Sequence, residues 1–172
     1  MSFNSIPEFS FSLINNRDPD TIKALKNALT THGFFTITDH GIDDDLLSAS
    51  YSMSKKFFEL EEATKNTYAH PEMGGARGYT PFGKETALGE TTPDMKEFWH
   101  HGPVTDDSFD TRITSNINVA ELPEFNSQFD GLFNDLNLLG MKVLSAIAVI
   151  LHKEPNFFDD WVSKGNSLLR LL

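Results

Sequence analysis

The sequence predicts an α+β protein, in which amphipathic helices and short strands occupy separate stretches of the chain. The first sign is residues 123–152, where apolar residues recur at helical spacing over a long stretch. The second is residues 6–11 and 34–38, which alternate or run apolar between turn residues, as strands do. Residues 168–172 are leucines apart from Arg170 and carry no polar tail, so we expect a final strand whose edge is open to pairing.

Capping and turn residues mark the elements of the first third of the chain. Residues 6–11 alternate and form the first predicted strand. Asp18 and Pro19 suit the start of a helix, with Asp as the N-cap and Pro where its missing N–H costs nothing, and Gly33 suits the end. Residues 34–38 form the second strand. A second helix follows the acidic cap at residues 43–45. Its expected buried face consists of Leu46, Ser50, Met53, Phe57 and Leu60.

Glycine and proline divide the rest of the chain. Residues 71–92 are rich in glycine and predict a loop with a short strand, and residues 96–101 form the next strand. A long helix is expected from Pro123 to about His152, followed by a short helix after Pro155 and by the terminal strand. The expected buried seam of the long helix consists of Phe125, Phe129, Leu132, Leu136, Leu139, Val143, Ile147 and Ile150.

Composition excludes several classes of protein. The formal net charge of -11, with 14 Lys+Arg against 25 Asp+Glu, disfavours nucleic acid as a partner. The chain has no cysteine, so it forms no disulfide, thiolate metal site or cysteine nucleophile. The first residues lack the basic and apolar regions of a signal peptide, and no uninterrupted apolar run approaches the roughly 20 residues of a membrane span. We therefore expect a cytoplasmic protein that binds neither nucleic acid nor membrane.

Histidines and carboxylates raise the question of a metal site. A facial triad for Fe(II) needs two histidines and one carboxylate. His70 and Glu72 offer a His-x-Glu triplet that could recruit His101, with Arg112 as a partner for an anion. Pro71 and the glycine-rich loop count against this site, because mobile loops hold ligands poorly. The second triplet begins at His152, which more simply complements the dipole at the end of the long helix.

Neighbouring positions in the predicted strand 96–101 point to opposite faces. His100 and His101 therefore cannot chelate one ion together, and we expect one to make an interior hydrogen bond and the other to face solvent. Arg77 stands in a glycine-flanked loop beside Tyr79. Its guanidinium could clamp a substrate carboxylate through two parallel hydrogen bonds. The alternative is a surface arginine that braces a flexible loop.

Several ordered blocks of residues are familiar. They are Ile6-Pro7-Glu8-Phe9, His32-Gly33-Phe34-Phe35-Thr36-Ile37-Thr38-Asp39-His40-Gly41-Ile42, Phe57-Phe58-Glu59-Leu60 ahead of Lys65, Arg77-Gly78-Tyr79-Thr80-Pro81-Phe82-Gly83-Lys84-Glu85, Asp94-Met95-Lys96-Glu97-Phe98-Trp99-His100-His101-Gly102 and Gly165-Asn166-Ser167-Leu168-Leu169-Arg170-Leu171. The set resembles the N-terminal region of iron(II)/2-oxoglutarate-dependent dioxygenases of the isopenicillin N synthase-like group. No single block is decisive, but together they cover nearly the whole chain.

This resemblance implies a domain organisation. Residues 1–120 would form a non-haem dioxygenase N-terminal domain. Residues 121–172 would form a long supporting helix, a short helix and the first strand leading into a double-stranded β-helix (jelly roll). The fold would then be the helical and strand layer of such an oxygenase, with the barrel incomplete in this chain. In that family the His-x-Asp pair, the distal His and the Arg-x-Ser that binds 2-oxoglutarate come later than any residue present here. We therefore carry over no catalytic, metal-binding or cofactor-binding residue.

The resemblance also implies a function. A full-length member uses Fe(II) and 2-oxoglutarate to hydroxylate, desaturate or cyclise a small molecule, whereas this chain alone is expected to be inactive and to bind neither. Arg77 and Tyr79 lie in a segment that often borders the substrate mouth in the family, and we carry them over as substrate contacts. The alternative is a non-catalytic interaction module, or one half of a split oxygenase, that uses its open strand edge to self-associate or to dock a separate C-terminal half.

Overall fold

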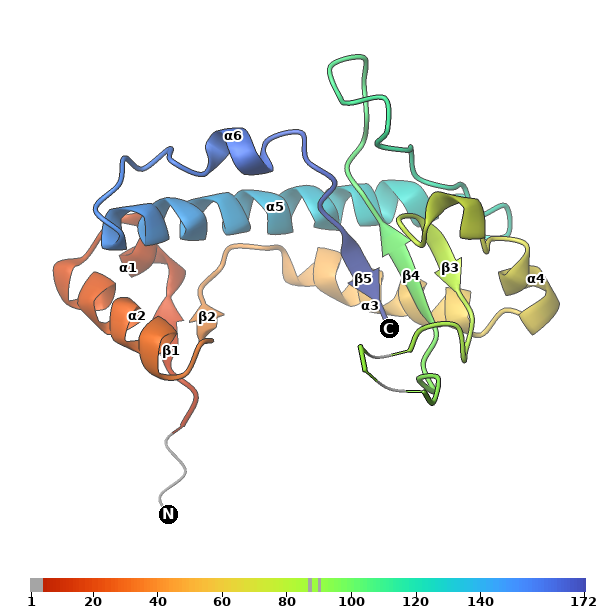
Figure 1. The fold of residues 1–172 in the computed structure, drawn as a ribbon, viewed down its shortest axis with the longest axis horizontal. Helices are drawn as coiled ribbons and strands as arrows, with labels where there is room; N and C mark the ends of the chain where they lie inside the picture. Colours follow the sequence, from red (N-terminus) through yellow and green to blue (C-terminus); the bar gives the residue numbers. More distant parts are fainter. Residues whose placement is uncertain (1–4, 87, 90) are drawn as a thin grey trace. The chain divides into compact units, whose positions relative to one another are not determined.

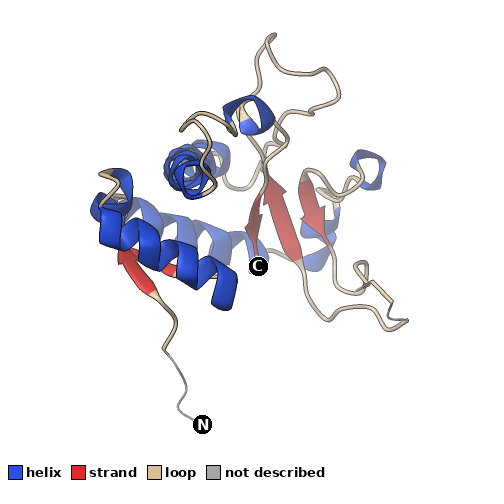
Figure 2. Ribbon diagram, turned by 60° about the vertical axis from the view of Figure 1, so that its left-hand side comes forward, coloured by secondary structure: helices blue, strands red, loops and turns tan. Residues whose placement is uncertain are grey.

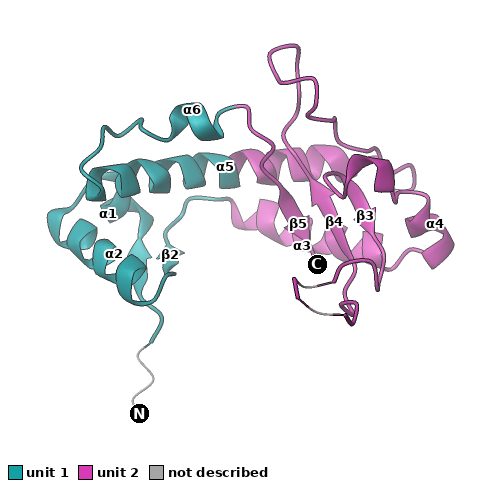
Figure 3. Cartoon of the chain, in the orientation of Figure 1, with its two compact units in different colours: residues 1–42, 136–163 teal, residues 43–135, 164–172 magenta. Residues whose placement is uncertain are grey.

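The computed structural model describes residues 5–86, 88–89 and 91–172, which belong to two compact units (Figure 3). Unit 1 comprises residues 1–42 and 136–163, and unit 2 comprises residues 43–135 and 164–172. The predicted α+β class is confirmed, and the described residues form no closed barrel. The signal-peptide prediction rested partly on residues 1–4, which lie outside the described residues, as do 87 and 90 of the predicted glycine-rich loop.

Unit 1 is built around two parallel strands (Figure 1). Strand β1 (Glu8–Ser10) pairs with β2 (Thr36–Thr38), and the crossover that parallel strands require is formed by helices α1 (Phe11–Asn15) and α2 (Pro19–Thr31). Helix α2 starts as predicted, because the Asp18 carboxylate accepts a hydrogen bond from the N–H of Thr21 at 2.9 Å.

The core of unit 1 lies between these elements and the C-terminal part of helix α5 (Phe125–Ile150). The short helix α6 (Asp159–Val162) follows α5 in the chain. The fully or nearly buried core residues are Ile14, Leu25, Ala146 and Ile150, with Phe9, Ile22, Leu29, Phe35 and Ile37 packed around them.

Unit 2 contains the three-stranded sheet drawn in red in Figure 2. Its strands are β3 (Gly78–Thr80), β4 (Phe98–His101) and β5 (Leu169–Leu171), all antiparallel, with β4 in the centre. The remaining elements of the unit are helix α3 (Asp44–Phe58), helix α4 (Glu62–Asn66), the 3₁₀ turn η1 (Pro71–Met73) and the N-terminal part of α5.

The register of the sheet gives it two distinct faces. Tyr79, Trp99 and Leu171 stand opposite one another and share the face that packs on the helices, which we call the core face. There the Trp99 ring lies 4.8 Å from Phe57 of α3 and 4.9 Å from Phe125 of α5, between ring centroids. Phe57, Trp99 and Phe125 are fully buried, so this aromatic cluster is the core of unit 2.

Several sequence predictions need correction. The segment after β1 continues as helix α1 instead of a longer strand, and helix α4 was not predicted. Helix α5 begins at Phe125, two positions after the predicted start, and ends at Ile150. Leu136, placed in the buried seam, is 38 % exposed at the point where α5 passes from one unit to the other. The predicted domain boundary at residues 120 and 121 stays a prediction.

Helix α5 also bears on the expectation about membranes. Among the described residues it is the one helix long and apolar enough to cross a membrane by length and composition, with a mean hydropathy of 1.4. The core helix of a soluble protein meets the same criterion. Here Phe125, Phe129 and Leu132 pack inside unit 2, and Ala146 and Ile150 pack inside unit 1.

Candidate functional site

The face of the sheet opposite the aromatic core carries a groove of about 390 Å³. Because side chains alternate along a strand, Phe98, His100 and Arg170 all point to this side, which we call the groove face. Loop residues on either side of β3 and the start of β5 complete the lining. The residues that line the groove are Gly74, Gly75, Ala76, Thr80, Lys84, Glu85, Phe98, His100, Leu168 and Arg170.

Arg170 is the central charged group of the groove. Its guanidinium carbon lies 4.2 Å from the centroid of the Phe98 ring, so a cation–π contact fixes the plane of the group. Its Nε donates a hydrogen bond to Nε2 of His100 at 2.7 Å, and its Nη2 lies 3.5 Å from a carboxylate oxygen of Glu85. These contacts hold the cation in place. The side chain is still 38 % exposed, so the cation remains open to the groove.

His100 is buried and holds one defined tautomer. Its Nδ1 lies 2.5 Å from the carbonyl oxygen of Gly75, which only accepts, so Nδ1 carries the proton. Nε2 is then the free lone pair that accepts the Nε–H of Arg170. Burial lowers the pKa of His100, and the nearby Arg170 cation lowers it further. The ring is therefore neutral near pH 7. Because His100 and His101 are both buried, the expectation that one of the two faces solvent is wrong.

The acidic group of the groove is already paired. Nζ of Lys96 lies 2.6 Å from Glu85 and 2.9 Å from Asp94. The hydrogen bond from Lys96 is the largest of the effects that lower the pKa of Glu85. The carboxylate of Glu85 is thus shared between Lys96 and Arg170, and the contact with Lys96 is the shorter of the two.

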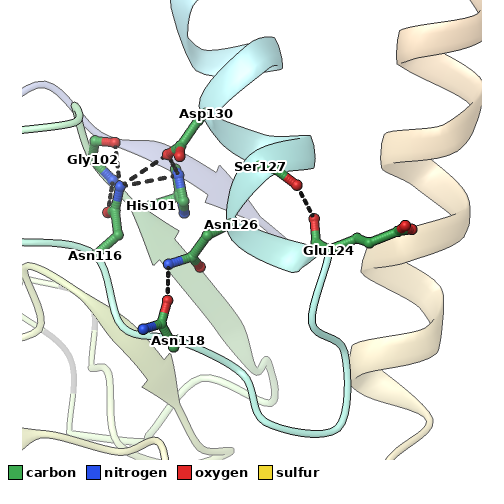
Figure 4. Close-up of polar contacts among 8 residues, drawn as sticks. All are labelled: His101, Gly102, Asn116, Asn118, Glu124, Asn126, Ser127 and Asp130. Carbon is green, nitrogen blue, oxygen red and sulfur yellow. Dashed lines mark hydrogen bonds and ion pairs between the residues drawn. The ribbon is translucent and has the colours of Figure 1, made fainter.

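On the core face, His101 belongs to a different polar cluster (Figure 4). It is fully buried, and its Nε2 lies 2.7 Å from the carboxylate of Asp130 on α5. The side-chain amide of Asn116 pairs with both the N–H and the C=O of Gly102 and points its amide nitrogen at the same carboxylate. This confirms the predicted interior hydrogen bond for one of the two adjacent histidines.

The cluster also ties the start of α5 to the segment before it. In Figure 4, Asn126 donates to Asn118 at 2.8 Å, and the hydroxyl of Ser127 donates to the carbonyl of Glu124 at 3.0 Å. These contacts join the first turn of α5 to the residues that precede it.

The two predicted substrate contacts are both buried. Arg77 is 1 % exposed, which excludes the alternative of a surface arginine. Its guanidinium lies directly over Gly102, where an added Cβ atom would clash with its Cζ. Burial lowers the pKa of Arg77, and its Nε and Nη2 have no hydrogen-bond partner among the described residues. The prediction that Arg77 contacts substrate stays a prediction.

Tyr79 lies on the core face, where its hydroxyl group donates to Glu97 at 2.5 Å. Glu97 also accepts a hydrogen bond from Nζ of Lys65 at 2.7 Å. Burial, followed by the hydrogen bond to Glu97, raises the pKa of Tyr79 well above its ordinary value. Its role as a substrate contact also stays a prediction.

The residues present do not fit an iron centre. Nδ1 of His70 lies 2.8 Å from Glu72, but His101 is bonded to Asp130 instead, so the three candidate ligands are not brought together. No group of three or more His, Asp or Glu side chains that could hold a metal occurs within residues 5–86, 88–89 and 91–172. Arg112, proposed as an anion partner of that site, is exposed and pairs with Asp110.

Sequence reasoning missed the groove residues Arg170, His100 and Glu85. Arg170 had one usable signal, since it is a lone cation in the otherwise apolar stretch 168–172. Its partner His100 is 70 positions away along the chain, and only the β4–β5 register brings the two together.

The fold and groove define a class of protein, and comparison with known families identifies it. Residues 6–121 match the family model described as non-haem dioxygenase in morphine synthesis N-terminal. The chain therefore belongs to the non-haem dioxygenase N-terminal family. The resemblance to the N-terminal region of iron(II)/2-oxoglutarate dioxygenases is confirmed.

Individual relatives agree with this assignment. The chain is 26% identical to the 2-oxoglutarate-dependent dioxygenase frbA of Dothideomycetidae sp. (strain 11243), over 97% of this chain and 53% of the relative. Among solved structures it resembles a 2OG-Fe(II) oxygenase family protein from Caulobacter crescentus, with 38% identity, a TM-score of 0.78, and coverage of 96% and 55% of the two chains. It also resembles a Neurospora crassa protein in complex with alpha-KG and thymine, with 28% identity, a TM-score of 0.79, and coverage of 96% and 54%. The chain thus spans about half the length of these relatives.

Proposed function

We propose that this chain is the N-terminal part of an Fe(II)/2-oxoglutarate-dependent oxygenase of the isopenicillin N synthase-like group, and that its groove face forms one wall of the substrate pocket. Family membership and the half-length coverage of the relatives support this proposal. In it, residues 1–120 form the N-terminal domain, and residues 121–172 lead through β5 into a jelly roll. A gene that continues beyond Leu172 with His-Tyr-Pro and then His-x-Asp would match this organisation. A cytoplasmic location is part of the same proposal.

The observation that carries the substrate assignment is Arg170. A guanidinium fixed in plane by Phe98 and open to a groove is suited to a planar anion, since it can donate two parallel hydrogen bonds to a carboxylate. The groove has the volume of a small-molecule site and mixes apolar and polar lining. We therefore assign to the whole enzyme a small substrate that carries a carboxylate or a similar planar anionic group.

This assignment is tested by titrating the 172-residue chain with benzoate and with its neutral counterpart benzamide, followed by NMR. We expect benzoate to shift the resonances of the groove residues, and Arg170→Met to weaken its binding about tenfold or more, because a hydrogen bond to a charged group contributes about 1.5–3 kcal/mol. Arg112→Met is the matched control, since it removes an exposed arginine outside the groove. Equal binding of benzoate and benzamide would contradict the assignment.

The reaction itself requires a set of metal ligands that the described residues do not bring together. Fe(II) with 2-oxoglutarate would supply the oxidation in the whole enzyme, but the described donor set does not fit the metal. We expect the chain alone to be inactive and to bind neither Fe(II) nor 2-oxoglutarate tightly. Calorimetry under anaerobic conditions tests this expectation, and stoichiometric, micromolar binding of Fe(II) would contradict it.

Arg77 and Tyr79 keep a place in the proposal as substrate contacts. Both are buried, and Tyr79 lies on the core face, opposite the groove, so a substrate would reach them only after this part of unit 2 moved. Chemical-shift changes at Tyr79 during the benzoate titration would support such a movement. A response confined to Arg170 and its neighbours would leave Tyr79 with a structural role.

A second candidate function rests on strand β5. It has a neighbour on one side only among the described residues, so its other edge offers unpaired backbone groups to another strand. The chain could then act as an interaction module or as one half of a split oxygenase. Light scattering at high protein concentration tests for self-association, and a strictly monomeric, soluble chain would count against it.

A further inference from the structure

We propose that His100 is a positioning residue that aims the guanidinium of Arg170 into the groove, and that it does so as a neutral acceptor and not as a cation. This inference rests on the proposed function of the groove as an anion site, and it assigns a role to a residue that does not itself need to touch the ligand. It is carried by the contacts between His100, Arg170 and Gly75 on the groove face of the sheet.

The first step is the fixed tautomer of the ring. The carbonyl of Gly75 accepts at 2.5 Å from Nδ1, so the only proton of the neutral ring is committed there. Nε2 must then act as an acceptor, and the Nε–H of Arg170 meets it at 2.7 Å. The loop at residues 74–76 therefore determines, through the tautomer of His100, that the Nε–H of the guanidinium is the donor that bonds within the protein.

The second step is what remains on Arg170. A guanidinium has five N–H donors in a plane. The Nε–H is committed to His100, one Nη2–H faces Glu85, and the other three have no partner among the residues that the structure describes. Since Phe98 fixes the plane and His100 fixes the rotation within it, the outer Nη edge is left for a ligand. That edge is the one that pairs with a carboxylate through parallel hydrogen bonds.

The third step is electrostatic. The charged groups around the ring are Arg170, Arg77 and Glu85, with Lys96 held on the far side of Glu85. Burial, the largest effect, and the two arginines oppose a second proton on the ring, whereas the hydrogen bond to Gly75 and the carboxylate of Glu85 favour it; the net effect lowers the pKa of His100. A neutral ring thus supports the cation without adding a second positive charge beside it.

NMR of the ¹⁵N-labelled 172-residue chain tests the tautomer directly. At about pH 7.5, well above the ordinary pKa of histidine, long-range proton–nitrogen correlations should show a protonated Nδ1 and an unprotonated Nε2 on His100. The Nε–H of Arg170 should give a resolved signal that exchanges slowly with solvent. An Nε2–H tautomer or a charged ring would overturn the proposal, whether or not any ligand binds.

Two substitutions then separate positioning from packing. His100→Phe keeps an aromatic ring and removes the acceptor, so it should speed the exchange of the Arg170 Nε–H and weaken benzoate binding by about fivefold or more, as expected for one lost hydrogen bond. His100→Gln restores an acceptor oxygen near the position of Nε2 and should recover binding to within about twofold. His152→Phe removes an exposed histidine outside the groove and should leave both readouts unchanged.

The outcomes distinguish the two claims. Benzoate binding that depends on Arg170 but is equal in the wild type and His100→Phe would overturn the role of His100 and leave the anion groove standing. If the wild type does not bind benzoate, the anion groove fails, and the exchange rate of the Arg170 Nε–H in His100→Phe still decides the positioning role. An unchanged exchange rate in that variant would overturn it.

Discussion

The buried ion pair beneath the sheet offers the sharpest test of the packing that supports the groove. Nζ of Lys65 donates to Glu97 at 2.7 Å and to the carbonyl of Phe58 at 3.1 Å, and Tyr79 donates to the same carboxylate. The side chains of Lys65 and Glu97 are only 9% and 16% exposed. Glu97→Gln keeps the shape and an acceptor for Tyr79, but leaves the lysine charge without its counterion.

Burial sets the expected size of the effect. Removing one partner of a buried ion pair costs about 3–5 kcal/mol, whereas an exposed pair contributes about 0–1 kcal/mol. Because Gln retains an acceptor, we expect a loss of about 3 kcal/mol in the free energy of unfolding of unit 2. With a urea dependence of about 2 kcal/mol per molar, the midpoint of unfolding should fall by roughly 1.5 M.

Tryptophan fluorescence gives a suitable assay, since Trp99 lies in the core of unit 2 and the exposed Trp161 can be replaced by Phe in every variant. Lys65→Met with Glu97→Gln completes a double-mutant cycle. The double variant should be less destabilised than the sum of the single variants by about 2 kcal/mol, because no unpaired charge remains. A loss below about 1 kcal/mol for Glu97→Gln, or additive effects, would refute the view that the pair is buried and coupled.

Three further predictions concern the same unit. Gly78→Ala should destabilise it by roughly 2 kcal/mol or more in urea unfolding, because the residue has a φ of +78° and a Cβ would lie 2.6 Å from the carbonyl oxygen of Tyr68; a wild-type midpoint would contradict this backbone conformation. Phe57→Ala should cost about 3–5 kcal/mol by the same measurement, since it empties the centre of the aromatic cluster, and a loss near zero would show that the cluster is not packed as described. Burial lowers the pKa of His101, so below about pH 6.5 the unfolded chain binds a proton at this residue more readily than the folded chain does. The free energy of unfolding should therefore be highest above that pH and should fall as the pH decreases. Asp130→Asn removes the group that favours the charged ring, so it should extend this fall in stability to lower pH. Urea unfolding at a series of pH values measures the effect, and a free energy of unfolding that rises on acidification would contradict the lowered pKa of His101.

Local chemistry explains which elements could be predicted from the sequence. Asp18 and Asp43 both cap helices through their side chains, and the spacing of such signals is visible without any tertiary information. The strand predicted at residues 96–101 is present as β4, because alternation and β-propensity are also local. Helix α1 was missed because its five residues follow a strand directly and the side chain of its N-cap, Ser10, makes no capping hydrogen bond to the backbone.

The candidate site depends on contacts that the sequence does not display. Arg77 was predicted to stand in a glycine-flanked loop as a substrate contact or a surface arginine. Its guanidinium instead packs over Gly102, and only the folded structure shows that this glycine leaves room for it. One of His100 and His101 was expected to face solvent, because alternation places them on opposite faces of the strand. Alternation does not show that the loop at Gly75 covers His100. The role of Arg170 could not be predicted from the sequence, because it depends on the pairing of two strands, β4 and β5, that are distant along the chain.

The alternation along β4 links the stability of unit 2 to the chemistry of the groove. Trp99 and His101 are locked on the core face by the aromatic cluster and by Asp130, and both are fully buried. Phe98 and His100 each precede one of these two residues in β4. Their positions are therefore fixed as well, because adjacent residues of a strand cannot move independently. Rigid elements hold functional groups more accurately than loops do. The stacking ring and the hydrogen-bond acceptor of the groove therefore both belong to β4, whose four residues are all buried, and this rigid placement is what the proposed specificity of Arg170 for planar anions requires.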